Sequence, residues 1–389
     1  MKIEQRKWTE EHGWTPAPQS SVGQSAQLVL VFGATSILRE QRLLQQVKES
    51  YPHAHILGCS TAGEICGTTV SDNSLVTTAV RFEHTQLKVA RVQLEKSEHS
   101  LQAGKALAQA LPISVPAAGI DKEDKLIHVL VISDGLSVNG SELVRGLKEN
   151  LPEAVTITGG LAGDGERFKD TLVIWDSIPE KDTIVVLGLY GKRLKIGFGS
   201  LGGWDPFGPE RIITRSKGNV LYELDGHSAL ELYKQYLGEQ AKGLPATGLL
   251  FPLSIRTETE KTGVVRTILS VDEKTQSMTF AGDVPEGTYA RLMKANFDRL
   301  IDGAIGAAKT SYQAIGSSSP DLAILISCVG RKLVLKQRIE EEVEGVREIL
   351  GERTVLTGFY SYGEISPFTP GANCELHNQT MTITTLSEE

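Results

Sequence analysis

The sequence predicts a mixed α/β protein, in the α+β sense, made of two related domains by internal duplication. The order strand, helix, strand recurs along the chain, and each recurrence ends in a glycine-rich turn. Two of these turns, "GCSTAGEI" (58–65) and "GFYSYGEI" (358–365), share the frame Gly-x-x-x-x-Gly-Glu-Ile. Alternating strands follow the turns, so we expect a mixed β-sheet with flanking helices in each half of the chain.

The first repeat begins with "AQLVLVFGA" (26–34), whose apolar and β-branched residues predict a strand. Apolar residues at helical spacing over residues 37–47 predict a helix, which Pro52 closes. The stretch "HILGCSTAGEI" then begins as a second strand, and "SLVTTAVRF" follows the turn as an alternating strand. This repeat is therefore one strand, helix, strand unit that ends in the glycine-rich frame.

The same plan recurs twice. The second copy has strands at 125–135 and 154–165 around the helix "SELVRGLKENLP", and the third has strands at 321–332 and 353–365 around "RIEEEVEGVREILG". Aligned without gaps, Gly58 to Glu64 lies over Thr158 to Asp164. Three such units indicate internal duplication.

The stretch "GSLGGWDPFGPE" (199–210) is dense in glycine and proline, so we place the boundary between the halves there. The predicted organisation is an N-terminal extension at 1–25, a first domain at 26–200 and a second domain at 201–386. The longest helical pattern covers residues 288–315, and about 25 residues precede the first expected strand.

Composition excludes several classes of function. A formal charge of −8 and a pI near 5.6 argue against nucleic acid as a partner. No run approaches the roughly 18 apolar residues of a membrane span, and the N-terminus lacks a signal-peptide core, so we expect a cytoplasmic protein without membrane insertion. The four cysteines form no CxxC pair, so no zinc ribbon is indicated and reduced thiols are expected.

The repeated frame is not a phosphate loop, because glutamate follows its second glycine where the Walker pattern requires lysine. It does bring small residues, hydroxyls and a carboxylate to one turn, which suits an amine-bearing small molecule. The alternative is that the glycines only satisfy positive φ and the acids cap backbone amides. The predicted ligand-binding residues are Cys59, Ser60, Thr61, Gly63, Glu64, Gly160, Gly163, Asp164, Tyr360, Ser361, Gly363 and Glu364.

Two further hypotheses concern catalysis and haem. Cys59 is a candidate nucleophile with His55 on the same strand face as its base, although a cysteine in a strand is commonly a small buried hydrophobe. His55, ahead of His128, is a candidate axial ligand for haem b; the alternative is a hydrogen-bonded core histidine. We expect a protein that is not an enzyme, and keep a Cys59-dependent enzyme as an alternative.

Five blocks, in order over about residues 26–385, resemble the FIST family with its N-terminal and C-terminal domains. The blocks are "GCSTAGEI", "GGLAGDGERF", "GNVLYELDGHSALELYKQYLG", "LFPLSI" and "GFYSYGEISP". The resemblance implies an intracellular sensory protein that binds a small ligand, with amino acids among the candidates. Similar proteins carry kinase, cyclic-di-GMP or chemoreceptor output modules, and this sequence has none, so we expect a separate partner such as a histidine kinase or a cyclic-di-GMP enzyme. A stand-alone subgroup implies the alternative of a haem-based nitric oxide sensor in a two-component system.

Overall fold

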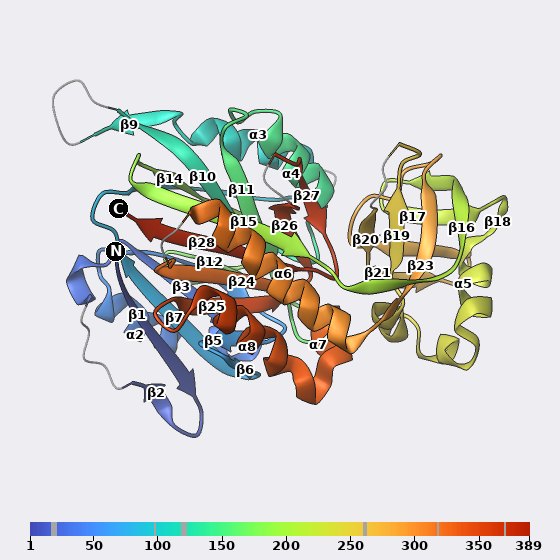
Figure 1. Cartoon of the computed structure of the whole chain (residues 1–389), viewed down its shortest axis with the longest axis horizontal. Coiled ribbons are helices and arrows are strands. Elements are labelled where there is room, and N and C mark those ends of the chain that lie inside the picture. The colour runs from blue at the N-terminus through green and yellow to red at the C-terminus, as the bar shows by residue number, and fades with distance from the viewer. Residues whose placement is uncertain (17–21, 97–98, 118–122, 260–262, 317–318, 369–370) are drawn as a thin grey trace.

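A computed structural model describes the chain except for residues 17–21, 97–98, 118–122, 260–262, 317–318 and 369–370. Figure 1 shows a large α/β body and a smaller lobe, rich in strands, at one end of it. The lobe runs from β16 to β23, between residues 204 and 295, and the body contains the rest. The predicted fold class of mixed sheets with flanking helices is confirmed.

The body contains the predicted unit three times. In each copy a central strand pairs in parallel with the strand that leads into the glycine-rich turn, and antiparallel with the strand that follows the turn. The units are β3 (Leu28–Gly33), α1 (Thr35–Leu38), α2 (Gln41–Ser50), β4 (His55–Ser60) and β7 (Ser74–Arg81); β10 (Glu123–Ser133), α4 (Gly140–Lys148), β11 (Thr156–Leu161) and β14 (Thr183–Tyr190); β24 (Leu322–Cys328), α7 (Val329–Leu335), α8 (Ile339–Leu350), β25 (Val355–Ser361) and β28 (Met381–Glu388).

The units exchange strands with one another. After its turn, each unit sends a short strand into a neighbour's sheet: β5 (Glu64–Cys66) pairs with β25, β26 (Gly363–Pro367) with β11, and β12 (Val173–Trp175) with β4. The exchange closes into a cycle, because each unit gives one strand and receives one. Residues from both predicted halves therefore share sheets, and the predicted boundary at residue 200 stays a prediction.

A strand also enters each unit from the preceding segment: β1 (Lys2–Thr9) pairs with β7, β8 (Gln86–Gln93) with β14, and β15 (Leu194–Leu201) with β28. The expectation that the first strand begins at residue 26 is wrong. The polar sequence of β1 carries no strand signal of its own, and its pairing with β7 makes it a strand. The remaining body elements are β2 (Gly13–Thr15), β6 (Thr69–Ser71), β9 (Ser114–Pro116), β13 (Ile178–Glu180), β27 (Cys374–His377), α3 (Ser100–Ala110) and α6 (Phe297–Ile315).

The lobe is an insertion between β15 and α6 (Figure 1). The helix expected over residues 288–315 is wrong in its first part, because residues 289–295 form a strand that pairs with two neighbours. The lobe elements are β16 (Trp204–Lys217), β17 (Val220–Leu224), β18 (His227–Ser228), α5 (Ala229–Leu237), the 3-10 turns η3 (Gly238–Gly243) and η4 (Ala246–Leu250), β19 (Leu253–Arg256), β20 (Val264–Arg266), β21 (Ile268–Asp272), β22 (Ser277–Phe280) and β23 (Tyr289–Ala295). No helix in the described part of the chain is long and apolar enough to cross a membrane.

Candidate functional site

The three glycine-rich turns meet inside the body. Gly163 donates its backbone N–H to Ser60 at 2.8 Å, Tyr362 donates to Leu161 at 3.2 Å, and Ala62 donates to Tyr360 at 2.8 Å. Each turn thus holds a neighbouring one through backbone atoms. The repeat therefore builds one shared centre from segments that lie up to three hundred residues apart.

The first glycine of each turn is required by the sheet. A Cβ atom at Gly58 would overlap the carbonyl oxygen of Val31, and one at Gly358 would overlap that of Leu325. These backbone atoms belong to the central strands β3 and β24. Glycine is required at these positions because the paired strand passes too close for any side chain.

Glu64 and Glu364 lie in matching hydrogen-bond networks. Glu64 accepts from the Thr61 hydroxyl, and from Ser74 through its N–H at 3.1 Å and its hydroxyl at 2.7 Å. Glu364 accepts in the same way from the Ser361 hydroxyl, and from Thr380 through its N–H at 3.2 Å and its hydroxyl at 3.0 Å. Both side chains are buried. Each carboxylate therefore ties its turn to the start of the strand that follows it.

Burial is also the main influence on these carboxyl groups. It raises the pKa of Glu64 to about 7 and that of Glu364 to about 8, while the hydroxyl and N–H donors act in the opposite direction. Both groups therefore titrate between their protonated and ionised forms near neutral pH, whereas an exposed glutamate would be fully ionised there.

The middle turn departs from this pattern. The alignment of Gly58 with Thr158 is wrong by one residue, because the central strands pair with Gly58, Gly159 and Gly358, and Leu161 accepts the bond between turns that Ser60 and Tyr360 accept in theirs. Ala162 therefore stands at the hydroxyl position and Gly165 at that of the glutamate. The Asp164 carboxylate accepts from the Thr35 hydroxyl at 2.8 Å and pairs with Arg167. Asp164 is thus bonded to Thr35 of the first unit, and it holds Arg167 beside the first turn.

A cavity of about 760 Å³ lies where the first and middle turns face the lobe. Its walls come from the first turn, the segment after Asp164, one face of α7 with the residues that follow it, and η4 of the lobe. The residues that line it include Thr61, Gly63, Glu64, Val70, Asp72, Gly165, Glu166, Arg167, Thr247, Leu250, Val329, Lys332, Lys336 and Ile339. This volume is typical of small-molecule sites.

Opposite charges face one another in this cavity. Three of its lining residues are cationic, Arg167, Lys332 and Lys336, and three are acidic, Glu64, Asp72 and Glu166. Lys332 donates to the Ala62 carbonyl at 2.8 Å, pairs with Asp72, and lies where a Cβ atom at Gly63 would come within 2.6 Å of its ammonium. Glycine at position 63 therefore makes room for a lysine supplied by another unit.

The predicted ligand-binding residues divide into two groups. Thr61, Gly63 and Glu64 line the cavity. The others are buried in or beside the contacts between turns and do not line the cavity: Cys59, Ser60, Gly160, Gly163, Asp164, Tyr360, Ser361, Gly363 and Glu364.

Cys59 is fully buried in an apolar cluster with Phe32 and Phe359. Burial raises the pKa of its thiol well above the ordinary value, which disfavours the nucleophilic thiolate. His55, the base expected to serve it, is exposed at the first residue of β4. This environment is that of a packing residue.

Neither His55 nor His128 has surroundings that fit a haem. The enclosed position expected for His55 is wrong, because its side chain faces solvent at the start of β4. His128 is fully buried, and its ring nitrogens bond the hydroxyls of Thr156 at 2.7 Å and Thr158 at 3.0 Å. Burial lowers its pKa to about 3, and the cavity beside it measures only about 10 Å³. His128 is therefore a neutral, hydrogen-bonded core residue with no room for a macrocycle.

Sequence reasoning missed Lys332, Arg167 and the lobe residue Thr247. Lys332 follows a buried strand in "ISCVGRK", where a lysine so close to the core was an available signal. Thr247 carried no signal, because only the folding of the lobe over the body brings it to the cavity. Within the described residues, no group of three or more histidine, cysteine or acidic side chains is arranged to hold a metal ion.

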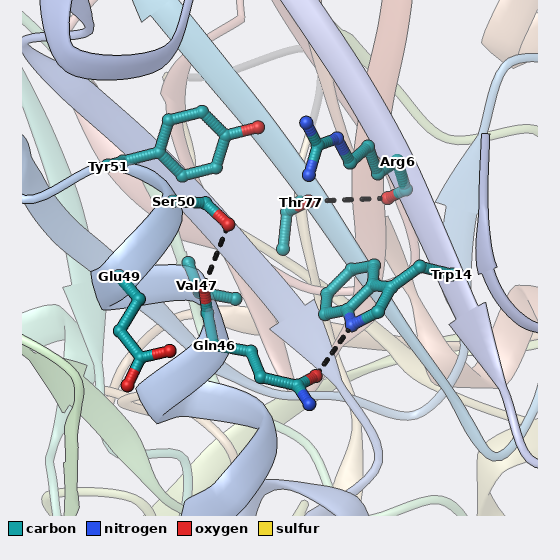
Figure 2. A pocket seen from close by; sticks show the side chains of 8 residues that line it. All are labelled: Arg6, Trp14, Gln46, Val47, Glu49, Ser50, Tyr51 and Thr77. Carbon is teal, nitrogen blue, oxygen red and sulfur yellow. Dashed lines mark hydrogen bonds between the residues drawn. The ribbon is translucent and has the colours of Figure 1, made fainter. Parts of the chain in front are cut away.

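Two other cavities are separate from the turns. One, of about 370 Å³, lies between the β1–β2 hairpin and α2. Trp14 donates to Gln46 there at 2.9 Å, and Figure 2 shows this pair together with Arg6 and Tyr51, which also line the pocket. The other, of about 530 Å³, lies between α4 and the lobe. Neither is lined by the repeated frame.

These features define an α/β protein built from repeated units, with a cavity at the junction of body and lobe. Family comparison agrees: the FIST N domain matches residues 27–227 and the FIST C domain matches residues 229–367. The chain belongs to the FIST family, whose domains are generally sensory.

A relative from Methanocaldococcus jannaschii, "Uncharacterized protein MJ1623", is 25% identical over 346 residues, or 83% of this chain. The chain spans 64% of that relative's length. Similar solved structures include a chorismatase (8% identity, TM-score 0.32, 99% and 98% of the two chains) and a cyanuric acid hydrolase from A. caulinodans (10%, 0.37, 100% and 98%). At TM-scores below 0.5 these likenesses support no statement about the reaction or ligand of this chain.

Proposed function

We propose that the chain is a non-catalytic sensor that binds a small zwitterion of the amino acid class in the cavity of about 760 Å³. The observation that carries the proposal is the presence of three cations and three acids in the lining of one cavity to which the repeated turns contribute. A carboxylate of the ligand would face Lys332 and Arg167, and its ammonium would face Glu64. Apolar lining from Val70, Val329 and Leu250 suits a short hydrocarbon side chain.

The position of the cavity supports a sensing role. Lys332 follows Arg331, a fully buried residue that pairs with Glu342 at 2.7 Å. Arg331 also donates to the carbonyls of Gly202 at 2.9 Å and Leu300 at 2.6 Å, in the two segments that join the lobe to the body. A ligand that displaces Lys332 would therefore also displace Arg331 in the same turn of α7, which is bonded to both segments that connect the lobe to the body.

The proposal extends to a separate signalling protein, a histidine kinase or a cyclic-di-GMP enzyme, in a cytoplasmic pathway. Support comes from the sensory character of the family and from exposed apolar side chains on β16 of the lobe, Phe207 and Ile212. The haem-based and Cys59-dependent alternatives have less support, because His55 is exposed and Cys59 is buried in an apolar cluster.

Calorimetric titration of the full chain with the standard amino acids tests the proposal. Butylamine and butyrate serve as half-ligands that carry only one of the two charges. We expect at least one amino acid to bind more tightly than either half-ligand, and Lys332→Met to weaken it about ten-fold or more.

The matched control is Lys192→Met, at an exposed position away from the cavity. Its affinity should equal that of the wild type. Failure of every amino acid to bind, or unchanged affinity in Lys332→Met, would refute the zwitterion site. A sharp haem spectrum after titration with haemin would instead favour the gas-sensor alternative.

A further inference from the structure

The cavity of about 530 Å³ on another side of the junction carries an excess of positive charge. It lies between α4 of the body, β19 and β20 of the lobe, and β27. Its charged lining residues are four cations and two acids: Arg145, Lys148, Arg256, Arg266, Asp283 and Glu375. In a chain of formal charge −8, this local reversal of sign is a feature of the site.

Arg266 is the one buried residue among the four cations that line this cavity. Its side chain is 6% exposed, and it donates from Nε to the Asp283 carbonyl at 3.0 Å and from Nη1 to the Leu376 carbonyl at 2.8 Å. Both acceptors are neutral. Among the residues that the structure describes, no carboxylate forms an ion pair with this guanidinium, and the acids of Asp283 and Glu375 act on it only at longer range.

Arg331 provides the contrast within the same chain. It is as deeply buried as Arg266, yet a carboxylate of Glu342 neutralises it at 2.7 Å. Burying a guanidinium without such a partner costs several kcal/mol, and burial indeed lowers the pKa of Arg266. The chain thus supplies the counter-ion at one buried arginine and leaves the other facing a cavity.

The other cations of the cavity are engaged on the protein. Arg145 pairs with Glu142 at 2.8 Å, Lys148 donates to Asn373, and Arg256 forms two bonds of 2.7 Å with Glu210. Among the described residues the partner of Lys148 is the neutral Asn373, so the charge of Lys148 is available to a ligand. Arg266 and Lys148 therefore define a place for an anion between lobe and body.

We propose that this cavity binds a small organic anion whose carboxylate or phosphate group pairs with Arg266 and Lys148. The apolar lining side chains of Ile255, Val264 and Leu376 suit a short hydrocarbon portion of the same molecule. The site is independent of the zwitterion cavity, because no residue lines both. Since Arg266 bonds the lobe through Asp283 and the body through Leu376, the anion also strengthens their junction.

Titration calorimetry and thermal unfolding of the full chain with propyl phosphate and with butyrate test this site, against sodium chloride at equal ionic strength. We expect one probe to bind and to raise the melting temperature, and its identity decides between phosphate and carboxylate. Arg266→Lys should weaken binding about ten-fold or more, because a lysine cannot offer the same fork of donors, and Lys148→Met should weaken it several-fold.

The matched controls are Arg42→Lys and Lys192→Met, both at exposed positions. If Arg266→Lys fails to fold by circular dichroism, Lys148→Met decides the question alone. The proposal is overturned if neither probe exceeds the chloride control, or if Lys148→Met binds the active probe as well as the wild type does. Unchanged binding of this probe in Lys332→Met separates this site from the zwitterion cavity.

Discussion

The first and third glycine-rich turns have the same chemistry and different surroundings. In both, a buried glutamate accepts from a hydroxyl three residues earlier and from a Ser or Thr at the start of the next strand. Glu64 lines the cavity of about 760 Å³, whereas Glu364 is fully buried behind it. The network is therefore structural first, and of these two glutamates only Glu64 lines the cavity.

The difference arises from what covers each turn. Lys332 reaches over Gly63 and leaves space beside it, while Asn378 donates to the carbonyl of Tyr362 at 3.3 Å and closes over the third turn. Copies of one unit can thus keep the same internal bonds and still differ in their surroundings. The following predictions test this comparison.

The largest effect is expected where the two turns are equivalent. Gly58→Ala and Gly358→Ala should each cost more than about 4 kcal/mol or prevent folding, because the added Cβ would overlap a backbone carbonyl. Chemical denaturation measures this cost. Gly202→Ala is the control, since its Cβ would make an ordinary contact of 3.4 Å, and a cost near 1 kcal/mol or less is expected. Unequal costs at Gly58 and Gly358 would contradict the equivalence.

A smaller effect should separate the turns. Glu364→Ala should lower the free energy of unfolding by about 3 kcal/mol, because the donors of Ser361 and Thr380 are left unpaired in the interior. Glu64→Ala should cost about 1 kcal/mol less, since water in the adjoining cavity can reach the donors there. Equal losses in urea denaturation would show that access to the cavity makes no difference.

The two turns should differ in the pH at which the loss of stability with rising pH comes to an end. The folded pKa values, about 7 for Glu64 and about 8 for Glu364, lie above those of the unfolded chain, so the folded state binds more protons in between. Stability should therefore fall as pH rises from about 4.5, and the total fall should be larger for Glu364, whose pKa is raised further.

Comparison of the wild type with Glu64→Gln and with Glu364→Gln, by denaturation from pH 4.5 to pH 9, isolates each contribution. The difference in free energy of unfolding between wild type and variant should become constant above about pH 7 for Glu64 and above about pH 8 for Glu364. A difference that does not change with pH would mean that the carboxyl group concerned keeps an ordinary pKa.

The smallest effect concerns ligand affinity. Glu64→Gln should weaken amino acid binding several-fold, or about 1 kcal/mol, because the ammonium loses a charged acceptor. Glu364→Gln should leave the affinity unchanged, since its side chain is fully buried away from the ligand. Calorimetric titration measures both. If neither variant changes the affinity, the carboxylates are structural in both turns.

Much of the body follows from local patterns. The strand, helix, strand units were predictable because a buried parallel strand is an apolar run of a few residues and its helix shows a 3.6-residue period. The topology shared by residues 26–65 and 321–365 is confirmed by the parallel pairs β3–β4 and β24–β25. Such signals lie within about ten residues of each other, so the sequence displays them directly.

The errors lie where distant partners decide local structure. Residues 289–295 carry a helical pattern, yet β16 and β19 flank them and provide hydrogen bonds that a helix would not use. The segment of β1 is polar along its length, and it becomes a strand because β7 needs a partner at that edge. Pairing with neighbours outweighs intrinsic propensity in both cases.

Local sequence patterns are enough to identify the repeated unit and its glycines, because backbone spacing inside each copy imposes them. Which copy lines a cavity depends on the tertiary structure. Exchange of strands between units brings Lys332 to the first turn, and the inserted lobe brings Thr247 and Leu250 over it. Burial and electrostatic fields depend on atoms hundreds of residues apart in the chain, so two copies of the same frame differ in whether they reach the cavity.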